Sequence, residues 1–258
     1  MRILANWFLQ EKTRICVPVT APEEGALKGA LAAMKREEAQ FDLIEWRADK
    51  YRAVFDREAL KAGAARIREA FPEKPVIFTL RTNKDMENFE ISDEDYENIN
   101  LFAASERLAE LIDVEYSRGE ALVRELSARL KEQGRLVICS RHERSHTPET
   151  AGILESLRAQ ARAGADLVKY AAMPRSRMDV LRLMEASVRY RESEGSLPLI
   201  SMSMGAEGVL SRIGGSLTGS VISFGTAGAA SAPGQLPAAK LRLILSALGS
   251  GGSREGLA

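Results

Sequence analysis

One lysine stands inside an otherwise apolar stretch, in the run Leu-Val-Lys-Tyr-Ala at residues 167–171. Taking an ammonium group out of water costs free energy, so we expect the pKa of Lys169 to lie below its usual value of about 10.4. Neighbouring cations such as Arg47 and Arg81 are expected to lower it further. A neutral amine can attack a ketone or aldehyde carbon to form a Schiff base. The sequence therefore predicts imine chemistry at Lys169.

A histidine is the expected partner of this lysine. An imine draws electrons from the adjacent carbon, and a base with a pKa near neutrality can then remove a proton there. His142 follows the apolar run of residues 136–140, and imidazole ordinarily titrates near neutrality. His142 and Lys169 on successive strands therefore predict imine-assisted proton abstraction.

The second histidine opens a competing interpretation as a metal site. His142 and His146 have the HExxH spacing of zinc peptidases, a pattern that binds zinc only on a helix, where residues four apart share a face. Residues 141–147 contain no apolar side chain to pack such a helix. Thr147 and Pro148 instead predict a helix with Thr147 as its N-cap and Pro148 at its first position. We therefore expect His142 to be a lone imidazole and the protein to use no metal or cofactor.

The elements that would position these residues alternate along the chain. The runs expected to be strands are residues 14–20, 41–47, 75–81, 111–116, 136–140, 165–171, 197–204 and 220–224. Stretches with helical periodicity include residues 26–38, 57–70, 99–111, 119–132, 150–163 and 177–192. Strands and helices that alternate with short connections form a parallel sheet. Eight such units predict an α/β fold of the (β/α)8 TIM-barrel type rather than an open Rossmann-type sheet.

The chain is expected to form a single barrel domain. We assign residues 1–248 to this domain, with residues 1–13 as an extra N-terminal segment that covers the bottom of the barrel. Residues 249–258 are rich in glycine and serine, a composition typical of a flexible tail.

Charged residues close several of the expected strands. Active sites of such barrels lie at the C-terminal ends of the strands. The two-residue period of a strand turns Glu45 and Arg47 to the same side. The other charged residues on or just after these runs are Arg81, Asp113, Glu115, His142 and Lys169. Any one of them could simply reach solvent, but their convergence on one mouth predicts an active site.

The composition limits the classes of partner. The 258 residues include 36 basic and 36 acidic residues, so the net charge is zero. Nothing points to nucleic acid, and an anionic substrate must be bound by a local cluster of arginines. No segment has the length of a membrane span, and the start does not look like a secretion signal. We expect a cytoplasmic protein in which Cys16 and Cys139 are buried, reduced thiols.

An ordered set of motifs resembles the type I 3-dehydroquinate dehydratase (3-dehydroquinase) family over most of the chain. The motifs are FDLIEWRAD at 41–49, FTLRT at 78–82, IDVE at 112–115, SRH at 140–142 with Thr147-Pro148, ADLVK at 165–169 with Met173-Pro174, SMG at 203–205, Ser211-Arg212, and SAPGQ at 231–235. The last of these is the most specific.

The resemblance implies a lyase of the shikimate pathway, which serves aromatic amino acid biosynthesis. Lys169 would form an imine with the C3 ketone of 3-dehydroquinate. His142 would take a C2 proton and later protonate the departing C1 hydroxyl, so that syn elimination gives 3-dehydroshikimate and water.

The resemblance also implies how this small anionic substrate is held. Glu45, which we count among the catalytic residues, would hold ring hydroxyls together with Arg47 and Arg81. The residues implied to bind the remainder of the substrate are Arg212, Ser231 and Gln235 at the carboxylate and Met204 against the ring. By analogy with the family, a homodimer is expected.

Two segments depart from the family pattern. The family usually has a Glu-Gly-Gly turn after the third strand, and its glutamate orients the histidine. Here Asp85 stands at the matching offset, and Glu87 is a second candidate. The Asp-Phe pair that usually follows the histidine is replaced by Glu143 and Arg144.

Three alternatives remain open. The glycine-rich segment 205–234 could bind a phosphate through backbone N–H groups, although Arg212 and Gln235 favour a carboxylate. A class I aldolase would use the same lysine to cleave a carbon–carbon bond. A binding protein could retain the anion pocket while the altered loop near Asp85 disables the base.

Overall fold

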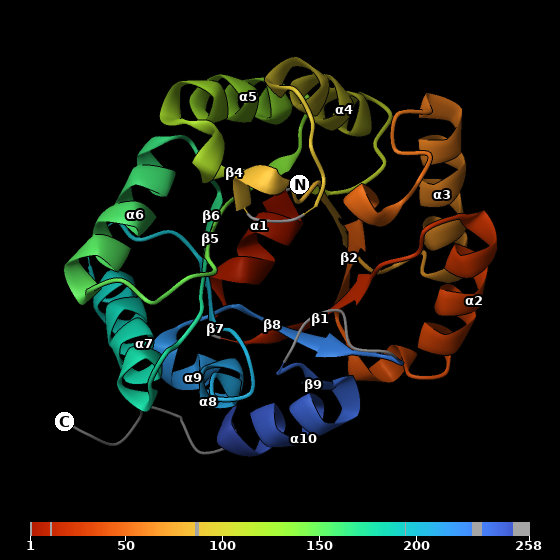
Figure 1. Ribbon diagram of the computed structural model, residues 1–258. Coiled ribbons are helices and arrows are strands. Elements are labelled where there is room, and N and C mark those ends of the chain that lie inside the picture. The colour runs from red at the N-terminus through yellow and green to blue at the C-terminus, as the bar shows by residue number, and fades with distance from the viewer. Residues whose placement is uncertain (1, 11, 86–87, 194, 229–233, 250–258) are drawn as a thin grey trace.

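Eight parallel strands form the inner wall of a barrel (Figure 1). They are β1 (Arg14–Val19), β2 (Leu43–Arg47), β3 (Val76–Thr79), β4 (Leu111–Glu115), β5 (Leu136–Glu143), β6 (Leu167–Ala172), β7 (Leu199–Ser203) and β8 (Ile222–Thr226). The structure is a computed structural model that describes residues 2–10, 12–85, 88–193, 195–228 and 234–249. The predicted (β/α)8 barrel is confirmed.

The barrel is closed unevenly. Each strand from β1 to β6 pairs with the next, and β1 also pairs with β8. Between β7 and β8 the contact is a single bridge, Leu199 to Ser220, in which the Val221 N–H donates to the Leu199 carbonyl oxygen at 2.8 Å. A short strand, β9 (Leu236–Pro237), pairs with the end of β8. The seam between β7 and β8 is thus the weakest part of the wall.

Helices surround this wall (Figure 1). They are α2 (Glu24–Lys35), α3 (Arg57–Ala70), α4 (Asp93–Ser105), α5 (Glu120–Glu132), α6 (Thr150–Arg162), α7 (Arg177–Arg191), α8 (Val209–Ile213), α9 (Gly215–Thr218) and α10 (Ala238–Gly249). Short 3-10 turns follow three strands: η2 (Ala48–Lys50) after β2, η3 (Asn83–Asp85) after β3 and η4 (Tyr116–Arg118) after β4. A further turn, η1 (Glu38–Gln40), lies between α2 and β2. Gly249 ends the last helix, and the rest of the predicted tail lies outside the described residues.

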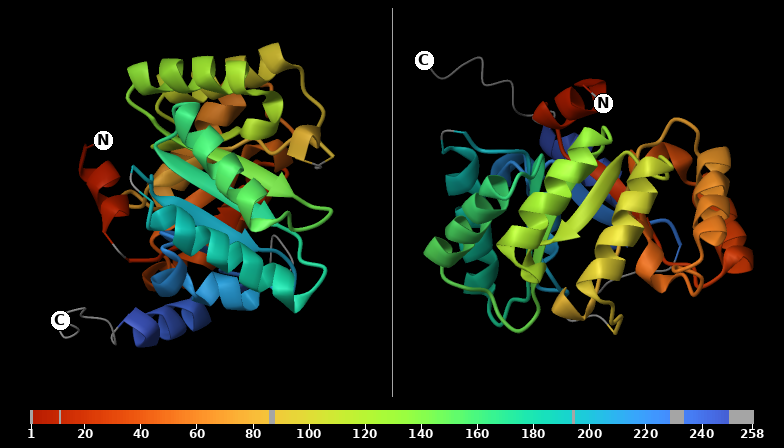
Figure 2. Two further views of the ribbon diagram at one scale, coloured as in Figure 1. Left: turned by 90° about the vertical axis from the view of Figure 1, so that its left-hand side faces the viewer. Right: turned by 90° about the horizontal axis from the view of Figure 1, so that it is seen from above.

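Alternate residues of each strand face opposite sides, as the pleat requires. Outward side chains such as Trp46 and Phe78 pack under the helices, whereas inward ones such as Leu43 and Ile77 fill the barrel. The helix α1 (Arg2–Leu9) places Phe8 against the inward cluster, and Figure 2 shows this helix at one end of the barrel. The prediction that residues 1–13 cover the barrel bottom is confirmed for this helix.

Two predicted helix boundaries are wrong. The helix expected at 99–111 is α4, which begins at Asp93 because the Ser92 hydroxyl accepts the Asp95 N–H and caps it. The helix expected to begin at Pro148 begins at Thr150 with Glu149 as its N-cap. Thr147 does not cap it, since its hydroxyl donates to the Met173 carbonyl oxygen at 3.0 Å. Both errors lie outside the strands that carry the candidate site.

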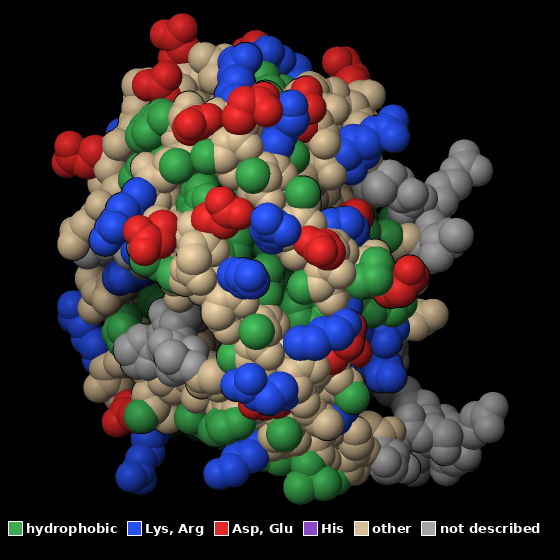
Figure 3. Space-filling model, turned by 90° about the vertical axis from the view of Figure 1, so that its right-hand side faces the viewer, with side chains coloured by type: hydrophobic (Ala, Val, Ile, Leu, Met, Phe, Trp, Pro, Cys, Tyr) green, Lys and Arg blue, Asp and Glu red, His purple; other side chains and the backbone are tan. Residues whose placement is uncertain are grey.

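The outer surface carries charges of both signs. On the face shown in Figure 3, Lys and Arg side chains lie among Asp and Glu side chains. Ion pairs on α3, such as Lys61 with Glu58 and Arg66 with Glu69, follow this pattern. Within the described part of the chain, none of the helices has the length and apolar character needed to cross a membrane. Cys16 and Cys139 are both buried free thiols, as predicted.

Candidate active site

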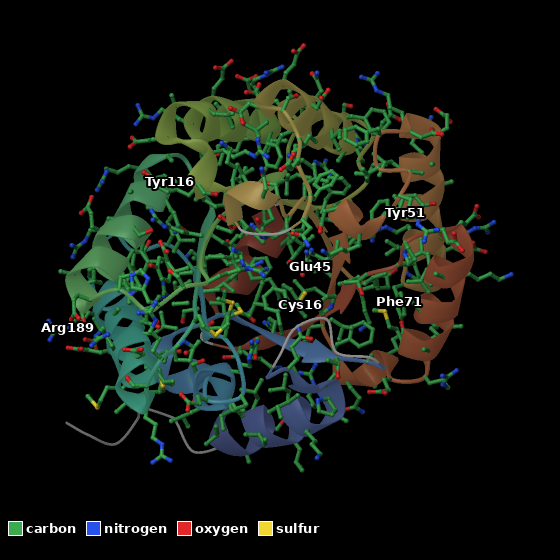
Figure 4. The ribbon with its side chains drawn as sticks, in the orientation of Figure 1. Cys16, Glu45, Tyr51, Phe71, Tyr116 and Arg189 are labelled. Atoms are coloured by element: carbon green, nitrogen blue, oxygen red, sulfur yellow. The ribbon has the colours of Figure 1, made fainter. Side chains whose placement is uncertain are left out.

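A cavity of about 240 Å³ opens at the C-terminal ends of the strands. Figure 4 shows Glu45 near the barrel axis, whereas Tyr51 and Phe71 lie between strands and helices and Arg189 lies at the periphery. The lining residues are Glu45, Arg47, Arg81, His142, Arg144, Lys169, Ala171, Met173, Met202, Met204, Gly205, Arg212, Phe224 and Gln235. Residues from β2, β3, β5, β6, β7 and β8 therefore meet in one place, as the barrel prediction requires.

The Lys169 ammonium is buried and held by two carboxylates. Its Nζ lies 2.9 Å from Asp113 Oδ2 and 3.2 Å from Glu45 Oε1, and 4.7 Å from the centre of the Phe224 ring. Burial alone would lower the pKa of Lys169, but the negative charges of Asp113 and Glu45 outweigh it and raise that pKa above its ordinary value. The predicted lowering is wrong, because the nearest charged groups are anions rather than arginines.

His142 is positioned by Asp85. In the β5–β6 ladder Ser140 is the partner of Lys169, and His142 is the partner of Ala171. Since His142 lies two residues after Ser140, the side chains of His142 and Lys169 point to the same side of the sheet. The Nδ1 of His142 lies 2.7 Å from Asp85 Oδ2. Asp85 is ionised, since burial raises its pKa but the hydrogen bond and charge of His142 lower it more. A carboxylate can only accept, so Nδ1 carries the hydrogen and Nε2 is the basic nitrogen.

The imidazole is neutral over most of the pH range. Burial and the charge of Arg81 lower the pKa of His142 to about 4, and the hydrogen bond to Asp85 only partly opposes them. A neutral imidazole can accept a proton, which is what a general base requires. The structure thus places Asp85, the favoured candidate, beside His142. The other candidate, Glu87, lies outside the described residues.

Arg81 is the central cation of the site. Its Nη1 donates to Asp85 at 3.0 Å, to Glu115 at 3.3 Å and to Ser140 at 2.9 Å, and its Nη2 donates to Asp113 at 2.8 Å. Burial lowers its pKa, but the three carboxylates raise it well above the ordinary value. These contacts make Arg81 an organiser of the buried charges. Its predicted contact with ring hydroxyls stays a prediction.

Arg212 faces a different environment. It is only 3 % exposed, and among the described residues its Nη1 contacts Met202 Sδ at 3.9 Å. Among the described residues, its Nε has no hydrogen-bond partner and no acidic side chain pairs with its guanidinium. Burial lowers the pKa of Arg212 to about 10. A buried cation with unused donors can bind an anion that enters the cavity.

The other predicted binding residues divide into three groups. Arg47 lines the cavity, and its Nε and Nη2 each donate to Asp49 at 2.8 Å. Met204 and Gln235 also line the cavity. Ser231 lies outside the described residues, so its predicted contact with a carboxylate is not placed.

The sequence analysis placed Asp113 at the barrel mouth without assigning it a contact, and it missed Phe224 and Ser117. Asp113 contacts Lys169, Phe224 lies under the ammonium, and Ser117 contacts Asp85. A carboxylate between apolar residues of a strand must have a buried partner, and this signal could have predicted the pairing of Asp113. Nothing local in the sequence marks Ser117 or Phe224.

The structure also places the two competing sequence patterns. His142 lies in β5 and His146 in the exposed loop after it, so the HExxH residues do not share a helix face. Of the glycine-rich segment 205–234, Gly205 lines the cavity, whereas residues 214–220 form α9 and its flanks and do not line it. Gly215 is required there by close packing, because a Cβ would lie 2.1 Å from Thr13 Oγ1.

Fold and site together define an α/β-barrel enzyme that has a buried lysine, a carboxylate-bound histidine and a buried arginine with an unused donor at the mouth. The family model for type I 3-dehydroquinase matches residues 15–251. The chain belongs to this family.

Known proteins agree with this assignment. The 3-dehydroquinate dehydratase of Klebsiella pneumoniae (strain 342) is 40% identical over 241 residues, which cover 93% of this chain and 95% of that protein. The Escherichia coli (strain K12) 3-dehydroquinate dehydratase is 37% identical over 235 residues, 91% of this chain and 92% of that protein. Among solved structures, the type I 3-dehydroquinate dehydratase of Clostridium difficile, solved with covalently modified comenic acid, has a TM-score of 0.88 at 31% identity and covers 94% of both chains.

Proposed function

We propose that this enzyme dehydrates 3-dehydroquinate to 3-dehydroshikimate through a Schiff base on Lys169, as a step of the shikimate pathway toward aromatic amino acids. The observation that carries the proposal is a buried lysine whose ammonium is held at the cavity beside a neutral, carboxylate-bound imidazole. Membership of the type I 3-dehydroquinase family supports this substrate.

Imine formation begins from the charged lysine. The Lys169 ammonium loses a proton, and the neutral amine attacks the C3 ketone carbon. The ketone oxygen then takes that proton and a second proton from the attacking nitrogen, and it leaves as water. The protonated imine that remains carries one positive charge, as the ammonium did. Asp113 and Glu45, which raise the pKa of Lys169, therefore stabilise the imine cation as well.

His142 then moves one proton. Its Nε2 takes the C2 proton, and the electrons of the C–H bond pass toward the imine nitrogen to form an enamine. The enamine expels the C1 hydroxyl, which leaves as water with the proton returned by His142. A second water hydrolyses the imine, releases the product and restores the lysine. The net reaction is loss of one water from the substrate.

The substrate is oriented by its carboxylate. We assign the carboxylate to Arg212, because this cation is buried and has unused donors. Gln235 lies on the same cavity and would assist it, together with Ser231. Glu45, Arg47 and Arg81 would hold the ring hydroxyls, and Met204 would contact the ring face. A planar guanidinium matches a carboxylate in two hydrogen bonds, which fixes the ring above Lys169.

Borohydride trapping tests the proposal. Enzyme is incubated with 3-dehydroquinate, reduced, and its intact mass is measured while the enone absorbance of the product is followed in an unreduced sample. An adduct on Lys169 with enone formation supports the lyase. An adduct without enone indicates a disabled base, and neither adduct nor enone indicates a different substrate.

We also expect the enzyme to act in the cytoplasm as a homodimer without a cofactor. Sedimentation of the purified protein measures its oligomeric state. Activity after dialysis against a chelator measures any dependence on a metal.

A further inference from the structure

Asp85 is bound on both oxygens, and the two oxygens have different partners. Oδ2 lies 2.7 Å from His142 Nδ1 and 3.0 Å from Arg81 Nη1. Oδ1 accepts the hydroxyl of Ser117 at 2.6 Å. Ser117 lies in η4, directly after β4, whereas Asp85 lies in η3, directly after β3. Two turns on neighbouring strands therefore meet through this hydrogen bond.

Three side chains, His142, Arg81 and Ser117, donate hydrogen bonds to Asp85, and they do not constrain its carboxylate equally. Arg81 Nη1 is shared among Asp85, Glu115 and Ser140, so its hold on any one of them is divided. His142 is the group that Asp85 must orient. Among the described residues, the Ser117 hydroxyl is the donor that reaches the remaining oxygen of Asp85. A carboxylate fixed at one oxygen cannot swing its other oxygen away from its partner without breaking the first bond.

We propose that Ser117 is a positioning residue, whose hydroxyl fixes the Asp85 carboxylate so that it holds the His142 imidazole with Nε2 as the base. The proposal rests on the function proposed above and adds a residue to it. Ser117 is not among the residues that line the cavity, and its hydroxyl donates to Asp85. Its effect must therefore pass through Asp85 to His142, in the order Ser117, Asp85, His142.

The position of Ser117 makes the proposal testable without loss of the fold. Asp85 is only 1 % exposed, but Ser117 is an exposed residue at the rim. Truncation of its side chain removes one hydrogen bond and creates no cavity in the core. Ser117→Ala removes the hydroxyl, and Ser117→Thr keeps it.

The test compares Ser117→Ala, Ser117→Thr, Asp85→Asn and the double variant Asp85→Asn/Ser117→Ala. Rates are expressed per active site, counted as the fraction of protein that borohydride traps. We expect Ser117→Ala to lower kcat about tenfold, the loss of one hydrogen bond to a charged group. KM should stay within about twofold because no substrate contact is lost. Ser117→Thr should restore most of kcat.

The double variant gives the decisive comparison. If Ser117 acts through Asp85, Ser117→Ala should have no further effect in the Asp85→Asn background. Ser105→Ala is the matched control, since Ser105 is exposed and, within the described part of the chain, its hydroxyl bonds the nearby Phe102 carbonyl oxygen. Wild-type kcat in Ser117→Ala, no rescue by threonine, or an undiminished effect in the Asp85→Asn background each overturns the proposal. Failure of the proposed function is distinct, because the wild-type enzyme would then form no enone.

Discussion

The cavity has two walls, one with many charged side chains and one that is mostly apolar. The ionic wall, on or just after β2 to β6, is formed by Glu45, Arg81, His142 and Lys169, and Asp85 and Asp113 contact these side chains from behind. The apolar wall, on β7, α8 and β8, consists of Met202, Met204, Arg212 and Phe224. Both walls bury an arginine to the same 3 % exposure, Arg81 in one and Arg212 in the other.

The pKa values of the two arginines show how the two walls differ. Burial lowers the pKa of both, but three carboxylates reverse the effect at Arg81 and raise its pKa well above the ordinary value. Arg212 has no such partner among the described residues, and its pKa falls to about 10. In the ionic wall both cations are paired with carboxylates of the protein, whereas Arg212 in the apolar wall has no such partner among the described residues. We expect the carboxylate of the substrate to become its partner, which would separate anion binding from the catalytic groups.

The largest expected effect follows from removal of the nucleophile. Lys169→Met should abolish dehydration, a loss of more than about 10⁴-fold in kcat, because no imine can form. Borohydride should then add no mass to the variant. Lys61→Met, at an exposed lysine of α3, is the matched control and should keep full activity. Dehydration at an undiminished rate in Lys169→Met, with the fold verified by circular dichroism, would refute the covalent mechanism.

The second effect concerns stability rather than rate. Arg81→Gln leaves three buried carboxylates without their shared cation, and we expect a loss of about 3 kcal/mol or more in the free energy of unfolding. Arg212→Gln should change it by less than about 1 kcal/mol, because that guanidinium pays a burial cost without a protein partner. Urea titration measures both. Equal losses in the two variants would contradict the distinction between the walls.

The third effect separates the walls by kinetics. Arg212→Gln should raise KM for 3-dehydroquinate about 10- to 100-fold, the value of charged hydrogen bonds to the carboxylate, with a smaller change in kcat. Arg189→Gln, which breaks an exposed pair with Glu185, is the control and should behave as wild type. An unchanged KM in Arg212→Gln would mean that the carboxylate binds elsewhere.

The smallest effect lies in the pH profile. The pKa of His142 is depressed to about 4, so the imidazole stays in its basic form as pH falls and becomes protonated only near that value. We expect kcat/KM to be independent of pH between about 5 and 7 and to fall by half near pH 4. Asp85→Asn removes the charge and hydrogen bond that raise the pKa of His142, so its acid limb should move to lower pH. Circular dichroism at each pH distinguishes protonation of His142 from acid unfolding. An acid limb of kcat/KM near pH 6.5 would contradict the conclusion that burial lowers the pKa of His142.

Local sequence patterns predicted the strands and many of the site residues. They failed to predict contacts between residues that are far apart along the chain. The strands and the positions of Lys169 and His142 followed from apolar runs and the two-residue period. Ser92 and Asp95 are typical of a helix start, but we predicted the start of this helix at residue 99, later than its observed start at Asp93. The N-cap role of Thr147 was wrong because its hydroxyl bonds Met173, 26 residues away.

The sequence by itself determined which residues face the inside of the barrel, because the pleat of a strand is a local property of the chain. It also placed a lysine, a histidine and several carboxylates at one end of the strands. Only the tertiary structure decided the sign of the pKa shift at Lys169, since Asp113 and Glu45 lie 56 and 124 residues away along the chain. Coulomb energies depend on distances across the barrel, and those distances exist only once the strands have closed.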